Sequence, residues 1–206
     1  MRAMFRVVFV ILGAGILSAN ADGEPTTQNC PESTNPDGWN FISNDVQYLM
    51  LERNFHPEGG ENTECLSSTI SKKDPSTHSA NALIKFRPKS TKEWQTIPQS
   101  YQFFQESHEG PYNIMNTTEE SAKPKASYKF GYTTNNCAGV FVQYLGPLNN
   151  EVSVADQQAE TKCVLWLRQG QDKSEAQCCR RFLQSHCGQA EFHTIYDMET
   201  CDESAN

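Results

Sequence analysis

Short runs of alternating apolar and polar residues recur along most of the chain, and turn-forming residues such as Gly, Pro and Asn separate them. This alternation predicts β-strands, because successive side chains of a strand point to opposite faces. The pattern places eight strands at residues 46–55, 63–71, 81–87, 93–97, 101–106, 126–133, 140–145 and 162–168. A turn at residues 110–111 leads into a further strand-like stretch at 112–115. Residues 37–41 are predicted to form a turn or a short helical piece that buries Trp39 and Phe41.

Eight short strands at nearly even spacing, followed by one helix, favour an all-β fold with an antiparallel up-and-down barrel. An eight-stranded barrel closes around an interior that can hold one small ligand. A β-sandwich is the alternative. It fits the strands but gives no reason for a C-terminal helix that several cysteines fasten in place.

The helix is predicted over about residues 172–187. Apolar side chains and one histidine recur there at steps of three and four, at Ala176, Cys179, Phe182, Leu183 and His186. Ser174 and Gln177 have the spacing of a capping box, and Gly188 is a typical stop. Cys178 and Cys179 point about 100° apart on a helix, so they can reach two separate partners.

The N-terminus has the features of a secretory signal peptide at residues 1–21. Arg2 and Arg6 precede an apolar run at 7–17, and the small residues at 19 and 21 mark a cleavage site. A membrane anchor is the weaker alternative, because the run is too short to span a bilayer. We therefore expect a secreted, soluble product, residues 22–206, that forms a single domain with a polar, irregular arm over 22–36.

The net charge limits the kinds of partner that the protein can bind, and the cysteine content indicates disulfides instead of a metal site. The net charge is −8, and it becomes −10 once Arg2 and Arg6 leave with the signal peptide. Such acidity argues against nucleic acid and anionic membranes as partners and mildly favours cationic small molecules, although it also serves solubility alone. Eight cysteines in an exported chain predict four disulfides. A zinc site would need closely spaced cysteine pairs at matching intervals, so we predict no metal.

No catalytic motif is present. The sequence lacks a nucleophile elbow, a zinc-protease helix and a phosphate-binding glycine loop, and its five histidines are scattered. We therefore predict a protein that is not an enzyme and needs no cofactor. The sequon that begins at Asn116 predicts a glycan on a surface loop.

The order of several short motifs resembles the tick salivary lipocalins, the tick histamine-binding protein family. The pieces are Asp37-Gly38-Trp39, residues 48–53, Cys65, Asn136-Cys137, Cys163 with Leu165 and Trp166, Cys178-Cys179, and Cys201. The resemblance covers nearly the whole mature chain. It implies a lipocalin barrel of eight strands with the C-terminal helix packed outside. Members of this family bind host mediators such as histamine, serotonin, leukotrienes and other lipids during feeding, and some bind complement proteins through the outer surface.

The resemblance also implies a disulfide pattern. It joins Cys65 to Cys201 and Cys137 to Cys179, and its six-cysteine members add a bond that corresponds here to Cys30–Cys178. Cys163 is then left with Cys187. Strand alternation is consistent with this last pair, because Cys163 faces outward, toward the helix, if Val164 and Trp166 face inward.

The chain departs from the family at two positions that matter for ligand binding. Histamine-binding members carry acidic residues that pair with the amine at the positions that here are Ala138 and Val164. A buried cation without such a partner is costly. Trp166 is retained, but both acidic residues are absent. The resemblance therefore implies the barrel, whereas these two residues argue against the family's amine site.

The lumen candidates are mainly apolar and aromatic. They are Leu51, Arg53, Phe55, Phe86, Phe130, Ala138, Val140, Tyr144, Val164 and Trp166. Arg53, and Arg168 if its side chain faces inward, offers a guanidinium to a carboxylate. For Arg53 the alternative is a structural role, in which it seals the barrel end by bonding backbone carbonyls near Trp39. For the aromatic residues the alternative is ordinary core packing.

Three functions follow as hypotheses for a monomeric, secreted protein. The first is binding of a hydrophobic or eicosanoid-like host mediator. The second is binding of a biogenic amine, which would use Glu52, Glu58 or Asp45 if the inward face of the first strand is the opposite one. The third is blocking of a host plasma protein of the complement type through the outer surface.

Overall fold

The computed structural model describes residues 30–32, 35–56, 62–118, 125–144 and 161–201. The predicted signal peptide and residues 22–29 of the predicted arm lie outside the described residues. Those two predictions therefore stay predictions.

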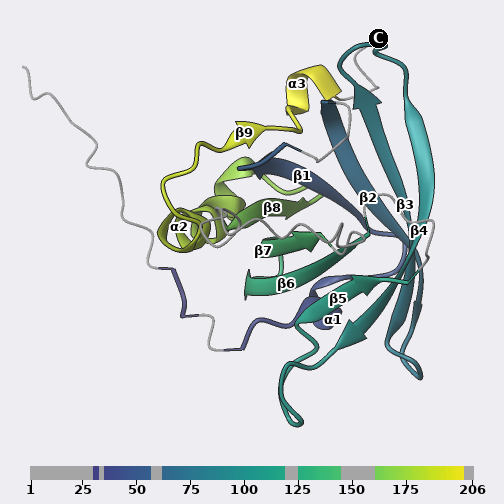
Figure 1. Cartoon of the computed structure of the whole chain (residues 1–206), viewed down its shortest axis with the longest axis vertical. Helices are drawn as coiled ribbons and strands as arrows, with labels where there is room; N and C mark the ends of the chain where they lie inside the picture. Colours follow the sequence, from purple (N-terminus) through teal and green to yellow (C-terminus); the bar gives the residue numbers. More distant parts are fainter. Residues whose placement is uncertain (1–29, 33–34, 57–61, 119–124, 145–160, 202–206) are drawn as a thin grey trace, which may run out of the picture.

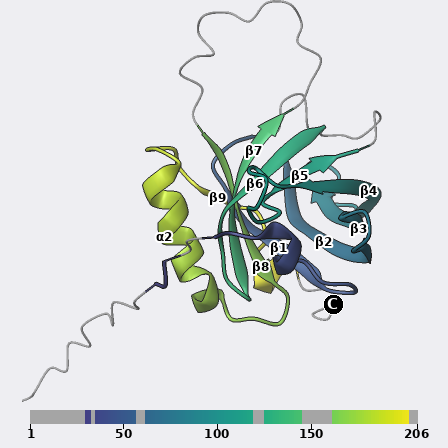
Figure 2. The ribbon, with the colours of Figure 1, turned by 90° about the horizontal axis from the view of Figure 1, so that it is seen from below.

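Eight antiparallel strands form a closed barrel (Figures 1 and 2). In chain order they are β1 (Gln47–Arg53), β2 (Thr63–Asp74), β3 (Ser79–Pro88), β4 (Gln95–Phe104), β5 (Ile114–Thr117), β6 (Ala126–Thr133), β7 (Cys137–Tyr144) and β8 (Lys162–Arg168). Each strand pairs with the next, and β1 pairs with both β2 and β8, which closes the ring. The predicted eight-stranded antiparallel barrel is confirmed.

The fourth and fifth predicted strands are wrong in detail. Residues 93–97 and 101–106 do not form two strands, because the chain runs through Pro98 as the single strand β4. Pro98 lies opposite Leu83 and the register continues on both sides of it. The fifth barrel strand is instead β5, built from the stretch that the sequence placed only as a continuation after a turn.

The predicted helix is formed by two consecutive pieces, a 3₁₀ helix η2 (Lys173–Ala176) and α2 (Gln177–His186). The predicted capping box is not formed. The side chain of Asp172 instead accepts a hydrogen bond from the Ser174 amide at 2.8 Å and caps the first turn. Gly188 follows the helix with φ of 73°, a conformation that favours glycine.

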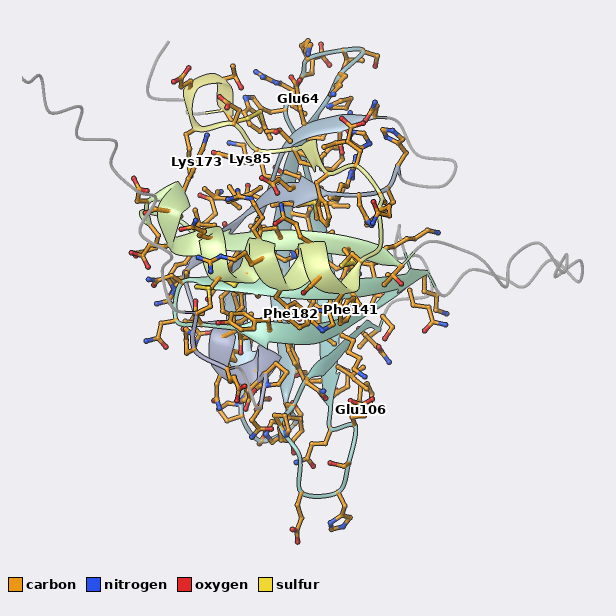
Figure 3. The ribbon with its side chains drawn as sticks, turned by 90° about the vertical axis from the view of Figure 1, so that its left-hand side faces the viewer. Glu64, Lys85, Glu106, Phe141, Lys173 and Phe182 are labelled. Carbon is orange, nitrogen blue, oxygen red and sulfur yellow. A yellow bond between two sulfur atoms is a disulfide. The ribbon has the colours of Figure 1, made fainter. Side chains whose placement is uncertain are left out.

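Apolar side chains form two separate cores because the barrel wall has two covered faces. The inner core lies inside the barrel and consists of Trp39, Phe41, Ile42, Tyr48, Met50, Ile70, Ala80, Ala82, Tyr101, Phe103, Ala126, Phe130, Ala138, Val140, Val142, Val164 and Ile195. The outer core lies between the wall and α2 and includes Leu49, Leu51, Tyr132, Leu165, Leu167, Ala176, Leu183 and five buried cysteines. Figure 3 shows α2 lying across the outer face of the barrel.

Four disulfides fasten the helix and the C-terminus to the barrel. They join Cys30 to Cys178, Cys65 to Cys201, Cys137 to Cys179, and Cys163 to Cys187, which are the pairs that the resemblance implies. Neighbouring Cys178 and Cys179 reach two different partners, as their positions on the helix predict. Three of the four bonds end on α2 or its C-cap, so the helix is fixed from several sides.

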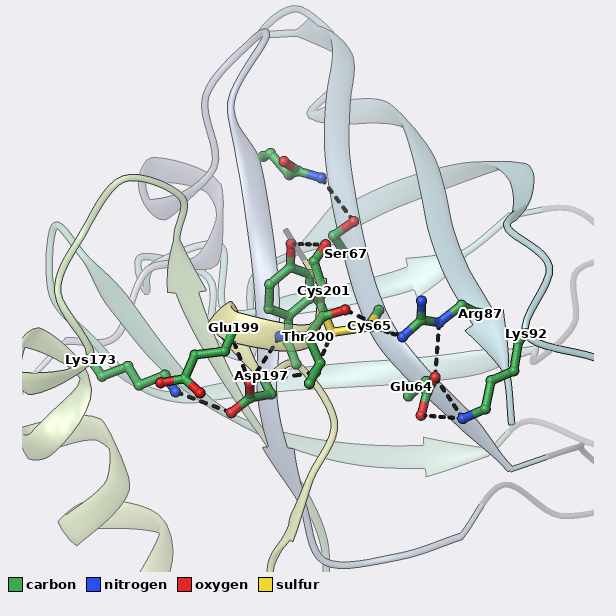
Figure 4. Close-up of a disulfide and its surroundings, with 12 residues drawn as sticks. Glu64, Cys65, Ser67, Arg87, Lys92, Lys173, Asp197, Glu199, Thr200 and Cys201 are labelled. Carbon is green, nitrogen blue, oxygen red and sulfur yellow. Dashed lines mark hydrogen bonds and ion pairs between the residues drawn. A yellow bond between two sulfur atoms is a disulfide. The ribbon is translucent and has the colours of Figure 1, made fainter. Parts of the chain in front are cut away.

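A short C-terminal segment completes the wall where β1 and β2 diverge. The strand β9 (His193–Thr194) pairs with β1 at Arg53 and Glu52, beyond the point where β2 pairs with β1. The Cys65 amide donates to the Ile195 carbonyl at 2.6 Å, so this segment bridges the two strands. The helix α3 (Met198–Cys201) follows, and its last residue is bonded to Cys65 (Figure 4). The sequence did not predict β9 or α3.

Candidate functional site

One end of the barrel is closed by the short helix α1 (Gly38–Phe41). Trp39 and Phe41 are buried there, as the sequence predicts. The Tyr48 hydroxyl donates to the Phe41 carbonyl at 2.9 Å and accepts from the Ser43 amide at 2.9 Å. A Cβ atom at Gly38 would lie 2.3 Å from the Phe130 ring, so α1 approaches β6 closely enough to require glycine.

Lys73 fastens this closed end. Its ammonium group donates to the carbonyl of Trp39 at 2.6 Å and to that of Ile42 at 3.0 Å, and it stands 4.1 Å from the centre of the Trp39 ring. Burial lowers the pKa of Lys73, and the nearby Asp37 carboxylate opposes this effect. A bulge in β2 between Ile70 and Lys72 interrupts strict alternation, which explains why the sequence did not reveal this role.

Arg53 does not seal the closed end, so the alternative role considered for it is wrong. It lies at the far end of β1, opposite Val164, and is only 3% exposed. Its guanidinium lies 5.8 Å from the centre of the Phe55 ring, and its Nη2 is 3.5 Å from the Thr63 hydroxyl. Arg168, in contrast, belongs to the closed end, where it donates to the Ser43 hydroxyl at 2.9 Å.

The inward face of β1 changes along the strand. Tyr48 and Met50 belong to the inner core, whereas Leu49 and Leu51 belong to the outer core beneath α2. The prediction that Leu51 faces the lumen is therefore wrong. A bulge between Met50 and Glu52 restores the predicted side for Arg53, because it adds one residue to the alternation.

The other lumen candidates lie mostly where the sequence placed them. Phe130, Ala138, Val140 and Val164 are buried in the inner core, and Phe55 and Trp166 pack against it while only partly buried. Phe86 is partly buried on the same side of β3 as Ala82, four residues away. Tyr144 ends β7, and its side chain is outside the described part of the structure.

The two positions at which the resemblance implies acidic residues in histamine-binding members lie on adjacent strands of the wall. Ala138 pairs with Trp166, and Val164 pairs with Val140, on adjacent strands β7 and β8. Ala138 and Val164 are both 0% exposed. No aspartate or glutamate is among the buried polar residues of the described chain.

Of the carboxylates proposed for the amine alternative, the two that lie within the described residues do not enter the inner core. Glu52 faces α2, where it accepts three hydrogen bonds from Arg180. Asp45 lies in an exposed turn with φ of 58°. Glu58 is outside the described residues.

Two polar side chains of the interior were missed by the sequence analysis. Gln99 and Tyr101 alternate with exposed or partly exposed residues along β4, and they are 4% and 7% exposed. Burial raises the pKa of the Tyr101 phenol well above its ordinary value, with a smaller contribution from Tyr128. The same alternation is visible in the sequence, but the assumed break at Pro98 left Gln99 outside both predicted strands and placed Tyr101 at the start of the second.

A groove of about 500 Å³ lies on the outer surface beside α2. Its lining includes Phe141, Phe182 and His186 from the helix side, and Glu106 and Lys129 from the opposite side. Figure 3 shows Phe141 and Phe182 together, with Glu106 further toward the closed end.

The predicted glycosylation site does not lie in a surface loop, so that placement is wrong. Asn116 is in β5, between β4 and β6, and is partly buried. The glycan itself stays a prediction.

The described residues contain no helix that is long and apolar enough to cross a membrane. Within the same residues, no group of three or more His, Cys, Asp or Glu side chains could hold a metal ion.

Comparison with known proteins identifies relatives at the level of the family. The model of the tick histamine binding protein family matches residues 27–203. No curated protein matches the sequence significantly.

Similar solved structures share little sequence with the chain. Japanin from Rhipicephalus appendiculatus bound to cholesterol has 11% identity and a TM-score of 0.48, covering 76% of this chain and 95% of that one. Per a 4 from cockroaches, a major allergen, has 11% identity and a TM-score of 0.46, with coverages of 82% and 95%. The AM182 serotonin complex has 12% identity and a TM-score of 0.46, with coverages of 78% and 87%.

Proposed function

Because the chain belongs to the tick histamine-binding protein family, we propose that it is a secreted salivary protein that binds a small, mainly apolar host mediator inside the barrel. Sequestration of that mediator would dampen host defence at the feeding site. The protein acts as a monomer and needs no cofactor for this role.

The observation that carries this proposal is the apolar wall at Ala138 and Val164. Both side chains are fully buried and neither can pair with a cation. Transfer of an unpaired ammonium group into such surroundings costs several kcal/mol. An apolar ligand has no such cost and gains about 25 cal/mol for each Å² of apolar surface that leaves water.

The partial exposure of several inward-facing residues supports a ligand in the barrel. Trp166, Tyr128, Met115 and Ile84 pack against the inner core but are not fully buried, although their neighbours along the strands lie on the outer side. A barrel interior that its side chains do not completely fill would account for this pattern and would admit a ligand. Arg53, at the end of β1 away from α1, supports a ligand that carries a carboxylate at one end.

The test is native mass spectrometry of the secreted protein, followed by titration with histamine, serotonin, leukotriene B4 and arachidonate. We expect binding of the lipids without binding of the amines. Tight amine binding would overturn the proposed ligand class and would direct attention to a carboxylate such as Glu58. If none of the four ligands binds, the result would count against a lumen ligand of either class.

A second candidate function, binding of a host plasma protein through the outer surface, is supported by exposed apolar side chains. Leu83 on β3 and Phe104 at the end of β4 are each 45% exposed. A complement-type partner would be detected by surface plasmon resonance with ligand-free protein. Leu83→Glu and Phe104→Glu should then abolish plasma-protein binding and leave lipid binding unchanged.

A further inference from the structure

The inward face of β4 carries a polar residue for which the fold gives no internal reason. Gln99 lies between Ile97 and Tyr101 on this face, directly opposite Ala82 of β3. Ala82 and Ala80 belong to the inner core, so Gln99 projects into the barrel beside small side chains. Only 4% of Gln99 is exposed.

The side-chain NH₂ group of Gln99 is a buried donor without an acceptor. Its Nε2 atom is buried and has no hydrogen-bond partner. In the same strand, Gln102 donates from Nε2 to the Thr77 carbonyl at 2.6 Å. Buried Asn54 also satisfies its amide, since its Nδ2 donates to Thr161 and its Oδ1 accepts from Cys163. A buried amide donor without a partner is uncommon and requires an explanation, such as a bound molecule.

Tyr101 places a second polar group two residues along the same face. Its ring meets Tyr128 edge to face, with ring centres 6.2 Å apart. Burial raises the pKa of this phenol, so the hydroxyl stays neutral and can donate. Residues two apart in a strand are separated by roughly 7 Å, a span that one polar group with its neighbouring atoms can bridge.

We propose that the Gln99 amide and the Tyr101 hydroxyl bind an uncharged oxygen, a hydroxyl or carbonyl group, of the otherwise apolar ligand. This inference rests on the proposed function and adds the chemistry that selects the ligand. Two neutral donors match a neutral acceptor, whereas an ammonium group would find no carboxylate there and a hydrocarbon would leave the amide unsatisfied. Preference for an oxygen-bearing ligand then arises because the unpaired amide penalises ligands that lack the oxygen.

The experiment compares ligands that differ only in the terminal group. 1-Dodecanol, dodecane and dodecylamine compete with the fluorescent probe 1-anilinonaphthalene-8-sulfonate for the secreted protein. The wild type should bind dodecanol about tenfold more tightly than dodecane, and dodecylamine most weakly. Gln99→Leu should remove most of the difference between dodecanol and dodecane, and Tyr101→Phe should reduce it. Gln143→Leu, a change at an exposed glutamine of β7, is the matched control and should keep the difference.

The outcomes separate this inference from the function on which it rests. If all three ligands fail to bind to the wild type, both proposals are overturned. If dodecane and dodecanol bind equally well, or if Gln99→Leu weakens both to the same extent, the lumen binds lipids but Gln99 does not select them. Gln99→Leu should also raise the melting temperature of the ligand-free protein. If this variant does not fold, the wild-type preference and Tyr101→Phe still decide.

Discussion

Glu52 of β1 and Arg180 of α2 form a two-pronged ion pair across the outer core, with Nη2 2.7 Å and Nε 3.0 Å from the same carboxylate oxygen. The next residue, Arg53, faces the interior of the barrel. Because of the bulge in β1, the Glu52 side chain points toward α2 and the Arg53 side chain points toward the barrel interior. Glu52 is committed to holding α2 and is not available to an amine in the barrel.

Replacing either partner of this ion pair should loosen α2 without affecting the lumen. We expect Glu52→Gln and Arg180→Gln each to lower the free energy of unfolding by about 1 kcal/mol, since the pair is partly exposed but has good geometry. Urea unfolding of both variants and of the double variant measures the coupling. Lys129→Gln, which breaks the more exposed pair with Glu106, is the control and should have a smaller effect. Loss of ligand binding in Glu52→Gln would contradict this assignment.

Much of the architecture could be predicted because it depends on local pattern. β6 and β8 have the predicted bounds, since clear alternation is bordered by turn residues. The short helix before β1 and the helix after β8 were likewise visible from Trp39 and from the spacing of the cysteines.

The errors have tertiary causes. Bulges at Met50/Glu52 and Ile70/Lys72 reverse the inward face, and no local signal marks them. These bulges explain why Leu51 was wrongly predicted to face the lumen and why the role of Lys73 was not predicted. The strand β9 is two residues long and exists only because β1 and β2 separate beside it. Pro98 concealed Gln99, since a proline in a sheet normally indicates an edge or a break, and the two strands predicted on either side of it left Gln99 out.

Protonation of Glu64 should reduce the stability of the folded protein in acid. Burial acts to raise its pKa, but hydrogen bonds from Lys92 and Arg87 outweigh this effect and lower the pKa below the ordinary value of 4.5. The folded state therefore binds fewer protons than the unfolded state between these two values. The stability that Glu64 contributes is complete above pH 4.5 and is lost as the pH falls through the lowered pKa.

Urea unfolding between pH 7 and pH 3 measures this contribution. Glu64→Gln should flatten part of the acid slope, and Glu93→Gln, at an exposed glutamate of the neighbouring turn, is the control. Figure 4 shows that Arg87 also reaches the carbonyl of Thr200, next to the Cys65–Cys201 disulfide. An acid slope that is the same in wild type and Glu64→Gln would show that this cluster contributes no pH dependence.

Removal of the Cys65–Cys201 disulfide should release the C-terminal segment and leave the barrel intact. We expect the double variant Cys65→Ala and Cys201→Ala to lose about 2–4 kcal/mol of unfolding free energy. Faster amide hydrogen exchange at residues 193–201 should accompany the loss, because the segment would lose its one covalent link to the barrel and keep only non-covalent contacts. The variant that lacks Cys30 and Cys178 is the control, since its exchange at 193–201 should match that of the wild type. Unchanged exchange in the first variant would refute the fastening role.

Trp166 should report ligand binding, because the three tryptophans lie in different surroundings. Trp166 packs against the inner core beside Ala138, Trp39 closes the barrel end, and Trp94 lies outside between Lys85 and Arg87 at 4.6 and 5.3 Å. Arachidonate should change the fluorescence of the wild type and of Trp94→Phe but should barely change that of Trp166→Phe. Trp166→Ala should weaken binding about tenfold or more, since a large aromatic contact is lost. If Trp166→Ala binds with unchanged affinity, the ligand does not contact β8, and a site nearer to Arg53 and Phe55 at the other end of β1 becomes the better assignment.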